Sequence, residues 1–282
     1  MGTGPLNNRV AVITGSTGGL GSALAEALLA KGVRVALLDL NLADVKAQAA
    51  ALGDQDVAMA YQVDVRSLAS VTAAMDAAAA HFGRIDIVVA NAGIGKTGSL
   101  EDIDPTDYEA VIDVNLNGVW RTLRAAVPHV QQTRGYLMAI SSMAAFVHLP
   151  MGASYSASKA GVWALCDAIR LELRPDGIDV GTVHPTFFRT PMVEEMLAND
   201  AALHLLGGAS EAQKQLVDKD SVIREIVRGI EHRSDMVVIP KRLSGIARAP
   251  GLFRRVAEKY MSNDDRVVVA KELARQEARQ DG

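Results

Sequence analysis

Short apolar runs alternate along the chain with longer segments in which apolar positions recur at a helical period. The apolar runs cover residues 10–14, 33–39, 57–63, 85–90, 136–141, 178–184 and 236–239. Segments of helical period lie between them, at residues 19–31, 42–52, 68–82, 106–131 and 154–174, and a looser one spans residues 191–233. Runs this short are typical of strands, and their apolar character along the whole length indicates that both faces of each strand are covered.

The order of these elements predicts the fold class. Strands that alternate with helices and are buried on both sides indicate a parallel sheet with helices on its two faces. Because crossover connections between parallel strands are right-handed, we predict an α/β protein with a single doubly wound, Rossmann-type domain. Ligands bind such sheets at the carboxyl ends of the strands, where the strand order reverses. Candidate functional residues are therefore expected at these ends.

Charge and composition narrow the classes of partner. The 282 residues include 29 Lys and Arg scattered among 33 Asp and Glu, which gives a net charge of −4 and no concentrated basic face for a nucleic acid. The apolar runs are too short to cross a bilayer. Cys166 is the single cysteine and the N-terminus has no apolar leader, so we expect a cytoplasmic protein. The six histidines lack the spacing of metal ligands, and we expect no metal.

A glycine-rich segment, residues 14–21, joins the first predicted strand to the first predicted helix. Glycines in such a turn let the backbone approach a pyrophosphate, and the helix N-terminus adds free N–H groups and the positive end of its dipole. Glycine is also needed in ordinary tight turns, but this turn follows a strand and opens a helix. We therefore predict a dinucleotide site that includes Gly15, Thr17, Gly19, Leu20 and Gly21.

Asp39 bears on which dinucleotide binds. It ends the second predicted strand, 18 residues after Gly21, near the spacing expected of the acid that binds the adenosine ribose hydroxyls. On its own, such an acid is more often a loop residue or the start of a helix. A carboxylate here would repel a 2′-phosphate, and no Arg or Lys stands in residues 16–20 or directly after Asp39 to offset it. We predict NAD in preference to NADP.

Tyr155 and Lys159 are four positions apart in a helical segment, so their side chains share a face. A tyrosine hydroxyl titrates near pH ~10, and a nearby ammonium together with an oxidised nicotinamide ring would favour the phenolate by roughly 3–4 kcal/mol. Ser142 ends the preceding strand, where its hydroxyl can hold a substrate oxygen as charge develops. Because an isolated Tyr–Lys pair is more often exposed and inert, the hypothesis depends on the whole constellation.

Four segments in fixed order complete that constellation. They are the glycine-rich turn, Asn-Ala-Gly at residues 91–93, Ile-Ser-Ser at residues 140–142 and Tyr-Ser-Ala-Ser-Lys at residues 155–159. In order and spacing, over about residues 8–239, they resemble the short-chain dehydrogenase/reductase family. The resemblance implies a nicotinamide-dependent oxidoreductase acting on alcohols or ketones.

The resemblance also implies roles for the matching residues. Asn115 matches a helix asparagine that anchors a water connecting Lys159 to solvent. Ser142 would position the substrate oxygen, and Tyr155 would donate or take its proton. Lys159 would orient the nicotinamide ribose and lower the pKa of Tyr155.

The remaining matches concern the cofactor. Asp64 and Val65 would contact the adenine, and Asn91, Ala92 and Gly93 would line the cofactor near its ribose. The segment with Pro185, Phe188 and Thr190 would contact the nicotinamide carboxamide, with Thr190 as the hydroxyl partner. This last match is imperfect, because the family usually has glycine after that proline and an aliphatic residue where Phe188 stands. Tyr155 and Lys159 would touch the cofactor as well.

These observations predict an NAD-dependent short-chain alcohol dehydrogenase or ketoreductase with Tyr155 as general acid/base. Apolar residues expected near the site favour an apolar or cyclic secondary alcohol or ketone, unless about half of them belong to the core. They are Ile94, Met143, Phe146, Leu149, Met151, Phe187, Met192 and Met196. Two alternatives stay open. One is an NADPH-dependent ketone or acyl-thioester reductase of the same fold, and the other is a non-catalytic dinucleotide-binding sensor.

The domain organisation follows from the same pattern. We assign residues 1–240 to the dinucleotide-binding and catalytic domain, with a substrate lid at about residues 191–215. Residues 241–282 are predicted to form a C-terminal helical extension, in which residues 251–261 and 267–279 are either charged amphipathic helices or a frayed tail. The apolar stripe of the first of these helices suits a core or a subunit interface better than a membrane surface. The long helices 106–131 and 154–174 resemble those with which the family forms dimers and tetramers, so we expect a homo-oligomer.

Overall fold

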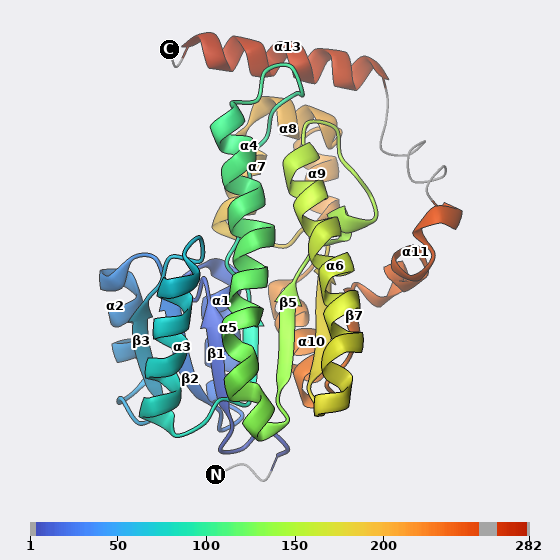
Figure 1. Cartoon of the computed structure of the whole chain (residues 1–282). Coiled ribbons are helices and arrows are strands. Elements are labelled where there is room, and N and C mark those ends of the chain that lie inside the picture. The colour runs from blue at the N-terminus through green and yellow to red at the C-terminus, as the bar shows by residue number, and fades with distance from the viewer. Residues whose placement is uncertain (1–3, 254–263, 281–282) are drawn as a thin grey trace.

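The computed structural model describes residues 4–253 and 264–280, and a parallel sheet forms its centre (Figure 1). In the described part of the chain the sheet has seven strands in the order β3-β2-β1-β4-β5-β6-β7, and every neighbouring pair is parallel. The strands are β1 (Val10–Thr14), β2 (Arg34–Asp39), β3 (Ala58–Gln62), β4 (Ile87–Ala90), β5 (Tyr136–Ile140), β6 (Asp179–Pro185) and β7 (Met236–Ile239). The predicted doubly wound α/β fold is confirmed, and the predicted strand ends lie within two residues of these bounds.

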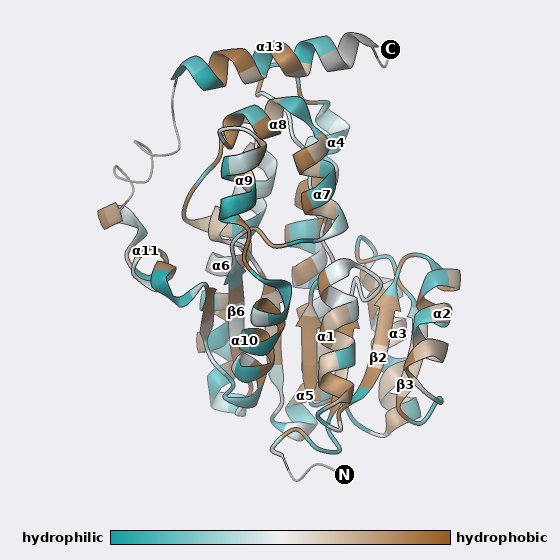
Figure 2. Ribbon diagram, turned by 180° about the vertical axis from the view of Figure 1, so that it is seen from behind, coloured by the Kyte–Doolittle hydropathy of each residue, from teal (hydrophilic) through white to brown (hydrophobic). Residues whose placement is uncertain are grey.

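Helices cover both faces of the sheet because side chains of each strand alternate between them. In β1, Ala11 and Ile13 pack toward α1 (Gly19–Leu29), α2 (Leu42–Leu52) and α10 (Lys219–Glu231). Val10 and Val12 pack toward α3 (Leu68–Phe82), α5 (Gly118–Thr133) and α6 (Ala153–Leu173). Figure 2 shows α1 and α10 on the face opposite to the one in Figure 1. The strand order reverses between β1 and β4, which places a crevice at the carboxyl ends of these two strands.

The predicted helix at residues 106–131 consists of three consecutive pieces. They are α4 (Pro105–Ile112), a π-helical turn η1 (Asp113–Asn117) and α5. The turn brings Asn115 into the interior, where it is fully buried. π-Helical turns inside α-helices are rare and frequently occur at functional sites.

The loosely patterned segment after β6 forms three short helices above the carboxyl edge of the sheet. These are α7 (Pro191–Ala198), α8 (Asp200–Leu205) and α9 (Ala209–Gln215). The excursion begins and ends at one point, because Phe188 pairs with Val217 in an isolated parallel bridge and the Val217 N–H donates to the Phe187 carbonyl at 2.8 Å. We call residues 188–217 the lid segment, after the substrate lid that the sequence predicts at about residues 191–215.

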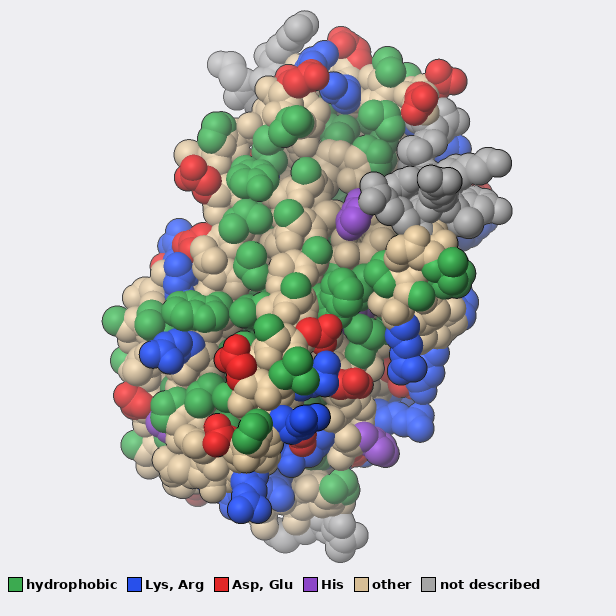
Figure 3. Space-filling model, turned by 45° about the vertical axis from the view of Figure 1, so that its right-hand side comes forward, with side chains coloured by type: hydrophobic (Ala, Val, Ile, Leu, Met, Phe, Trp, Pro, Cys, Tyr) green, Lys and Arg blue, Asp and Glu red, His purple; other side chains and the backbone are tan. Residues whose placement is uncertain are grey.

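A C-terminal helical extension follows β7, as predicted. It contains η4 (Lys241–Leu243), α11 (Ser244–Arg248) and α13 (Asp264–Gln280). The helix predicted at residues 251–261 lies largely outside the described residues. Helix α13 lies across α8 of the lid segment (Figures 1 and 2). Among the described residues, no helix is both long and apolar enough to span a bilayer. Acidic and basic side chains are interspersed on the face shown in Figure 3.

Candidate active site

The turn between β1 and α1 is packed so closely that two of its positions accept only glycine. Gly15 has φ +64°, and a Cβ atom there would lie 2.7 Å from the Ala92 Cα. A Cβ atom on Gly21 would lie 2.3 Å from the Gly15 carbonyl oxygen. Helix α1 begins after Gly18 without a side-chain cap from any described residue. Such a turn offers backbone N–H groups and the positive end of a helix dipole to an anion, so it fits a pyrophosphate.

Asp39 joins the end of β2 to this turn. Its Oδ2 atom accepts hydrogen bonds from the Thr17 N–H (2.9 Å) and the Thr17 hydroxyl (2.7 Å), and its Oδ1 atom accepts from the Leu40 N–H (2.7 Å). Gln48 of α2 holds the same turn through Ser16, whose hydroxyl donates to Gln48 Oε1 (2.9 Å) and whose carbonyl accepts from Gln48 Nε2 (2.7 Å). A carboxylate has about four acceptor sites, so the described donors leave Asp39 able to accept one more hydrogen bond.

Asn91 and Ala92 follow β4 at the point where the strand order reverses. The Asn91 side-chain amide donates to the carbonyls of Thr14 and Gly15, both at 2.9 Å. The backbone N–H groups of Asn91 and Ala92 donate to the Thr14 hydroxyl at 3.0 and 3.2 Å. The two residues expected near the cofactor ribose therefore also fix the glycine-rich turn against the end of β4.

Asn115 links the end of β4 to α6 from its place in the π-helical turn. Its Oδ1 atom accepts from the Ile94 N–H (2.8 Å), and its Nδ2 atom donates to the Ile94 carbonyl (2.9 Å) and to the Ser158 hydroxyl (3.3 Å). A Cβ atom on Gly93 would lie 3.3 Å from Asn115 Oδ1 and 3.6 Å from Lys159 Nζ. The structure thus brings Gly93, Asn115 and Lys159 together.

Ser142, Tyr155 and Lys159 also converge. Tyr155 and Lys159 lie one turn apart in α6, and the Lys159 Nζ atom lies 5.5 Å from the centroid of the Tyr155 ring. Lys159 is buried, and its ammonium donates to the Ile140 carbonyl at 2.9 Å. Ser142 begins the short helix η2 (Met143–Ala145) after β5, and it lies close enough to Tyr155 to lower the pKa of the Tyr155 hydroxyl.

Burial dominates the electrostatics of this group. It lowers the pKa of Lys159 to about 8. Burial also raises the pKa of Tyr155, and the hydrogen bond from Ser142 opposes this rise only in part. The expectation that Lys159, together with an oxidised nicotinamide ring, lowers the pKa of Tyr155 concerns the protein with its cofactor and stays a prediction. In the chain by itself, burial raises this pKa because it withdraws the phenolate from water. At neutral pH Tyr155 carries its proton.

The predicted adenine contacts, Asp64 and Val65, follow β3 at the same carboxyl edge. Asp64 pairs with Arg66 at 2.8 Å, and the hydrogen bond from Arg66 lowers the pKa of Asp64. Val65 is buried beside Gly118, on which a Cβ atom would lie 3.0 Å from Val65 Cγ2. In the strand order, β3 lies two strands from β1, so both residues lie toward the Asp39 end of the crevice.

The segment after β6 reaches the other end of the crevice. The Pro185 carbonyl lies 3.5 Å from the Ser142 hydroxyl. Thr190 caps α7 by accepting from the Val193 N–H at 3.2 Å, and a Cβ atom on Gly19 would lie 3.4 Å from the Thr190 Cα. Pro185 and Thr190 therefore connect the serine with the glycine-rich turn. The Phe188 side chain instead lies in the core on the α1 and α10 side of the sheet.

The apolar residues expected around the substrate divide into two groups. Met143 and Phe146 are buried in a cluster with Val238, and Met151 packs with residues of α8 and α13. Met192 of α7 lies across the crevice from Gly95, where an added Cβ atom would be 3.5 Å from its sulfur. Several of these positions thus belong to the core, while the lid segment presents a methionine to the opposite loop.

Sequence reasoning missed two residues that shape the site. Gln48 holds the glycine-rich turn, and His184 lies fully buried between the ends of β5 and β6. The position of His184 next to Pro185, at the carboxyl end of a buried strand, is the signal that could have identified it.

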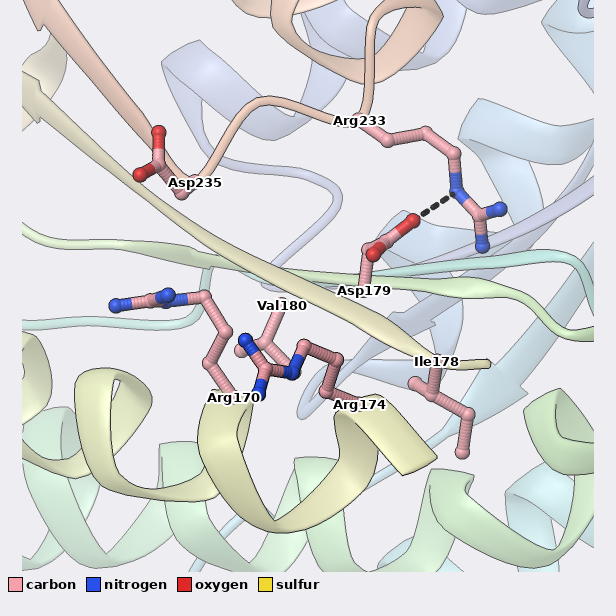
Figure 4. A pocket seen from close by; sticks show the side chains of 7 residues that line it. All are labelled: Arg170, Arg174, Ile178, Asp179, Val180, Arg233 and Asp235. Carbon is pink, nitrogen blue, oxygen red and sulfur yellow. Dashed lines mark ion pairs between the residues drawn. The ribbon is translucent and has the colours of Figure 1, made fainter. Parts of the chain in front are cut away.

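A second hollow, of about 160 Å³, lies at the opposite end of β6 (Figure 4). Arginine and aspartate side chains line it, and Arg233 pairs with Asp179 at 3.0 Å while Arg170 pairs with Asp167 at 3.4 Å. Because it lies at the amino end of the strand, it is separate from the crevice at the carboxyl ends.

Comparisons with known proteins show the family to which the chain belongs. A model of the short chain dehydrogenase family matches residues 9–201. The D-threitol dehydrogenase of Mycolicibacterium smegmatis is 36% identical over 189 residues, covering 66% of this chain and 73% of that protein. The 3-alpha-(or 20-beta)-hydroxysteroid dehydrogenase of Mycobacterium bovis is 36% identical over 210 residues, covering 74% and 80%.

A solved structure adds a comparison of the fold. The 3-ketoacyl-(acyl-carrier-protein) reductase from Brucella melitensis, complexed with NADH, superposes with a TM-score of 0.72 at 26% identity, covering 83% of this chain and 97% of that one. The chain therefore belongs to the short-chain dehydrogenase family and is an oxidoreductase with a nucleotide-binding fold.

Proposed function

We propose that the protein transfers a hydride between NAD(H) and a secondary alcohol or ketone that is apolar or cyclic. The observation that supports this most directly is the convergence of Ser142, Tyr155 and Lys159 beside the glycine-rich turn. Relatives described above carry an alcohol or a ketone substrate in their names, and they support the same reaction class.

In this proposal the chain's own residues manage the proton while NAD, when bound, supplies the hydride chemistry. In ketone reduction Tyr155 acts as the general acid, since burial keeps its hydroxyl protonated at neutral pH. The Ser142 hydroxyl donates a hydrogen bond to the same substrate oxygen as negative charge develops there. The nearby Lys159 ammonium stabilises the phenolate that remains. Alcohol oxidation is the reverse: Tyr155 must first lose its proton, and the resulting phenolate then takes the proton of the substrate hydroxyl.

Several features support NAD as the cofactor. Asp39 presents a carboxylate at the turn with one acceptor site free of described donors, which suits a ribose hydroxyl and opposes a 2′-phosphate. The solved relative described above is complexed with NADH. Asp64 and Val65 would contact the adenine, and Thr190 the carboxamide, from the two ends of the crevice.

Other parts of the chain take roles around this site in the same proposal. Residues 1–240 form the catalytic domain, with residues 191–215 as substrate lid, and residues 241–282 form the extension. A cytoplasmic location is consistent with the single cysteine, Cys166. Tyr108 of α4 and Trp120 of α5 are 41% and 44% exposed. These exposed aromatic side chains support a homo-oligomer formed through α4 and α5.

The Met192 side chain beside Gly95 and the hydroxysteroid dehydrogenase relative both favour an apolar cyclic substrate over a polyol. An NADPH-dependent acyl-thioester reductase is the second candidate, because the solved relative is a 3-ketoacyl reductase. Asp39 weighs against it, since its charge opposes the 2′-phosphate.

The decisive experiment follows NADH and NADPH absorbance across a panel of cyclic alcohols, cyclic ketones, polyols and a 3-ketoacyl thioester. We expect turnover with a cyclic alcohol or ketone and NAD(H). Tyr155→Phe should lower kcat by about 10²- to 10⁴-fold, because it removes the general acid, and should leave the dissociation constant of NADH unchanged. Substantial turnover by Tyr155→Phe, or a preference for the thioester with NADPH, would refute the proposal.

A further inference from the structure

His184 is a fully buried histidine next to the candidate active site. It lies on β6, directly before Pro185. Its Nδ1 atom is 3.3 Å from the Ser142 carbonyl oxygen, and its Nε2 atom is 2.8 Å from the Thr182 hydroxyl. Its ring centroid lies 4.8 Å from that of Phe146. The imidazole is therefore held on three sides.

The protonation of this ring follows from its surroundings. Burial lowers the pKa of His184 to about 4, the charge of Lys159 adds to this, and the contact with the Ser142 carbonyl opposes it. The ring is neutral near pH 7 and carries one proton. Because a carbonyl oxygen can only accept, that proton is on Nδ1, and Nε2 accepts from the Thr182 hydroxyl. Thr182 thereby fixes the tautomer that donates to Ser142.

The contact occurs where the backbone ladder between β5 and β6 ends. The last ladder bond runs from the Ser141 N–H to the Val183 carbonyl at 2.8 Å. One residue further, the Ser142 carbonyl is held by the His184 side chain. The Ser142 hydroxyl has a long contact of 3.5 Å to the Pro185 carbonyl, so it can turn toward a substrate. The direction of that hydroxyl depends on how the Ser142 backbone is held.

We propose that His184 is a positioning residue for hydride transfer, because its Nδ1–H fixes the Ser142 backbone so that the Ser142 hydroxyl faces the reacting oxygen. This inference rests on the proposed function. Small displacements of a group that contacts the reacting atoms reduce turnover strongly, by about 10²-fold for 1 Å. His184 would therefore affect kcat more than cofactor binding, since the glycine-rich turn is held by other residues.

Two substitutions separate the two ring nitrogens. In His184→Asn the side-chain amide can stand where Nδ1 stands and can still donate to the Ser142 carbonyl. In His184→Gln the amide reaches instead toward the position of Nε2 and Thr182. We expect kcat to fall by about 10- to 100-fold in His184→Gln and by less than about fivefold in His184→Asn. The dissociation constant of NADH should change less than about threefold in both variants.

The thermal midpoint and NADH binding of each variant serve as controls for folding. If His184→Gln does not fold, His184→Leu replaces it, because leucine has a similar volume and no donor. Wild-type kcat in the variant that lacks the Nδ1 donor would overturn the inference, as would equal losses of kcat and NADH binding in both variants. Tyr155→Phe is measured in parallel. An inactive Tyr155→Phe beside an unaffected His184→Gln would reject the role of His184 alone, whereas an active Tyr155→Phe would reject the proposed function.

Discussion

The Asp39 carboxylate is the residue through which the chain is expected to choose its nicotinamide cofactor. Replacing it by serine removes the negative charge and keeps an acceptor for the Thr17 N–H. We expect kcat/KM with NADPH to rise about 10- to 100-fold in Asp39→Ser, and kcat/KM with NADH to fall, because a like-charge contact in a closed site costs on the order of 1–3 kcal/mol. Steady-state kinetics with both cofactors measure the change.

Asp44 supplies the matched control for this substitution. It is an exposed acid in the first turn of α2, close in sequence to Asp39. Asp44→Asn removes a charge of the same sign from the same edge of the molecule, at a side chain that no described hydrogen bond links to the turn. If Asp44→Asn raises kcat/KM with NADPH as much as Asp39→Ser does, the effect comes from the net charge of this edge. Asp39 then does not contact the ribose.

The buried ammonium of Lys159 is expected to weaken the fold near neutral pH. Burial lowers its pKa from 10.5 to about 8, so between these values the unfolded chain binds more protons than the folded protein. Stability contributed by this group therefore rises with pH across that window, and below it the charged lysine disfavours folding by about 3 kcal/mol. From pH 7 to pH 10, we expect the unfolding free energy of the unmodified protein to rise relative to that of Lys159→Met.

Denaturant titrations at the two pH values measure this difference, in which the titrations of other groups cancel. The exposed Lys31, replaced by methionine, is the control for the loss of a lysine side chain. A constant difference for Lys159→Met would show that Lys159 titrates normally in the folded protein. Loss of turnover in the Lys159→Met variant is expected at pH 7, where Lys159 of the unmodified protein carries the charge that stabilises the phenolate.

Residue positions were predictable from the sequence where spacing along one segment determines them. Tyr155 and Lys159 share a helix face whatever the tertiary structure, because they are four residues apart. The place of Ser142 follows from its position at the end of a predicted strand. His184 could not be placed in this way, because its partner Ser142 is 42 residues away and only the sheet brings them together. The rise in the pKa of Tyr155 was equally inaccessible, since it depends on how completely the folded chain excludes water.

Among the elements, the strands were the most predictable, because strands buried on both faces need almost continuous apolar runs. The helix expected at residues 106–131 shows what such patterns omit. A continuous period suits α4 and α5, but the π-helical turn between them occurs where Asn115 turns inward to bond both backbone groups of Ile94. This contact belongs to the tertiary structure and leaves no mark in the spacing of apolar residues.

The substrate lid at about residues 191–215, inferred from small residues and a loose pattern, stays a prediction; the structure shows how the ends of this segment are held together. Phe188 and Val217 form a bridge of a single pair, outside any strand of regular pattern. A bridge of this kind cannot be recognised from periodicity. The bridge holds the two ends of the lid segment together beside Pro185. Movement of the lid segment would therefore change the surroundings of Ser142 at that end of the crevice.

Across the whole molecule, helix α13 joins two parts that border the crevice. The side chain of Ala270 is buried against Ala201 of α8 and against Met151. On its other side, Lys271 and Arg275 pair with Glu101 at 3.1 and 2.7 Å, in the loop that follows β4. One helix at the end of the chain therefore spans the lid segment and the opposite loop.

Charge placed in this contact should open the crevice. Exposed ion pairs contribute little individually, so the buried apolar contact is the better target. Ala270→Arg inserts a long charged side chain where no space exists, and we expect faster hydrogen exchange across residues 191–217 together with an increase of about 3- to 10-fold in the KM of the alcohol or ketone. Val268→Arg is the matched control, because Val268 is 68% exposed on the same helix and should change neither quantity. NADH binding should stay the same in both variants, since the glycine-rich turn does not contact α13 through Ala270.

Unchanged hydrogen exchange and an unchanged KM in Ala270→Arg would contradict this prediction. They would mean that the lid segment holds its position without α13, and that the extension serves another part of the molecule.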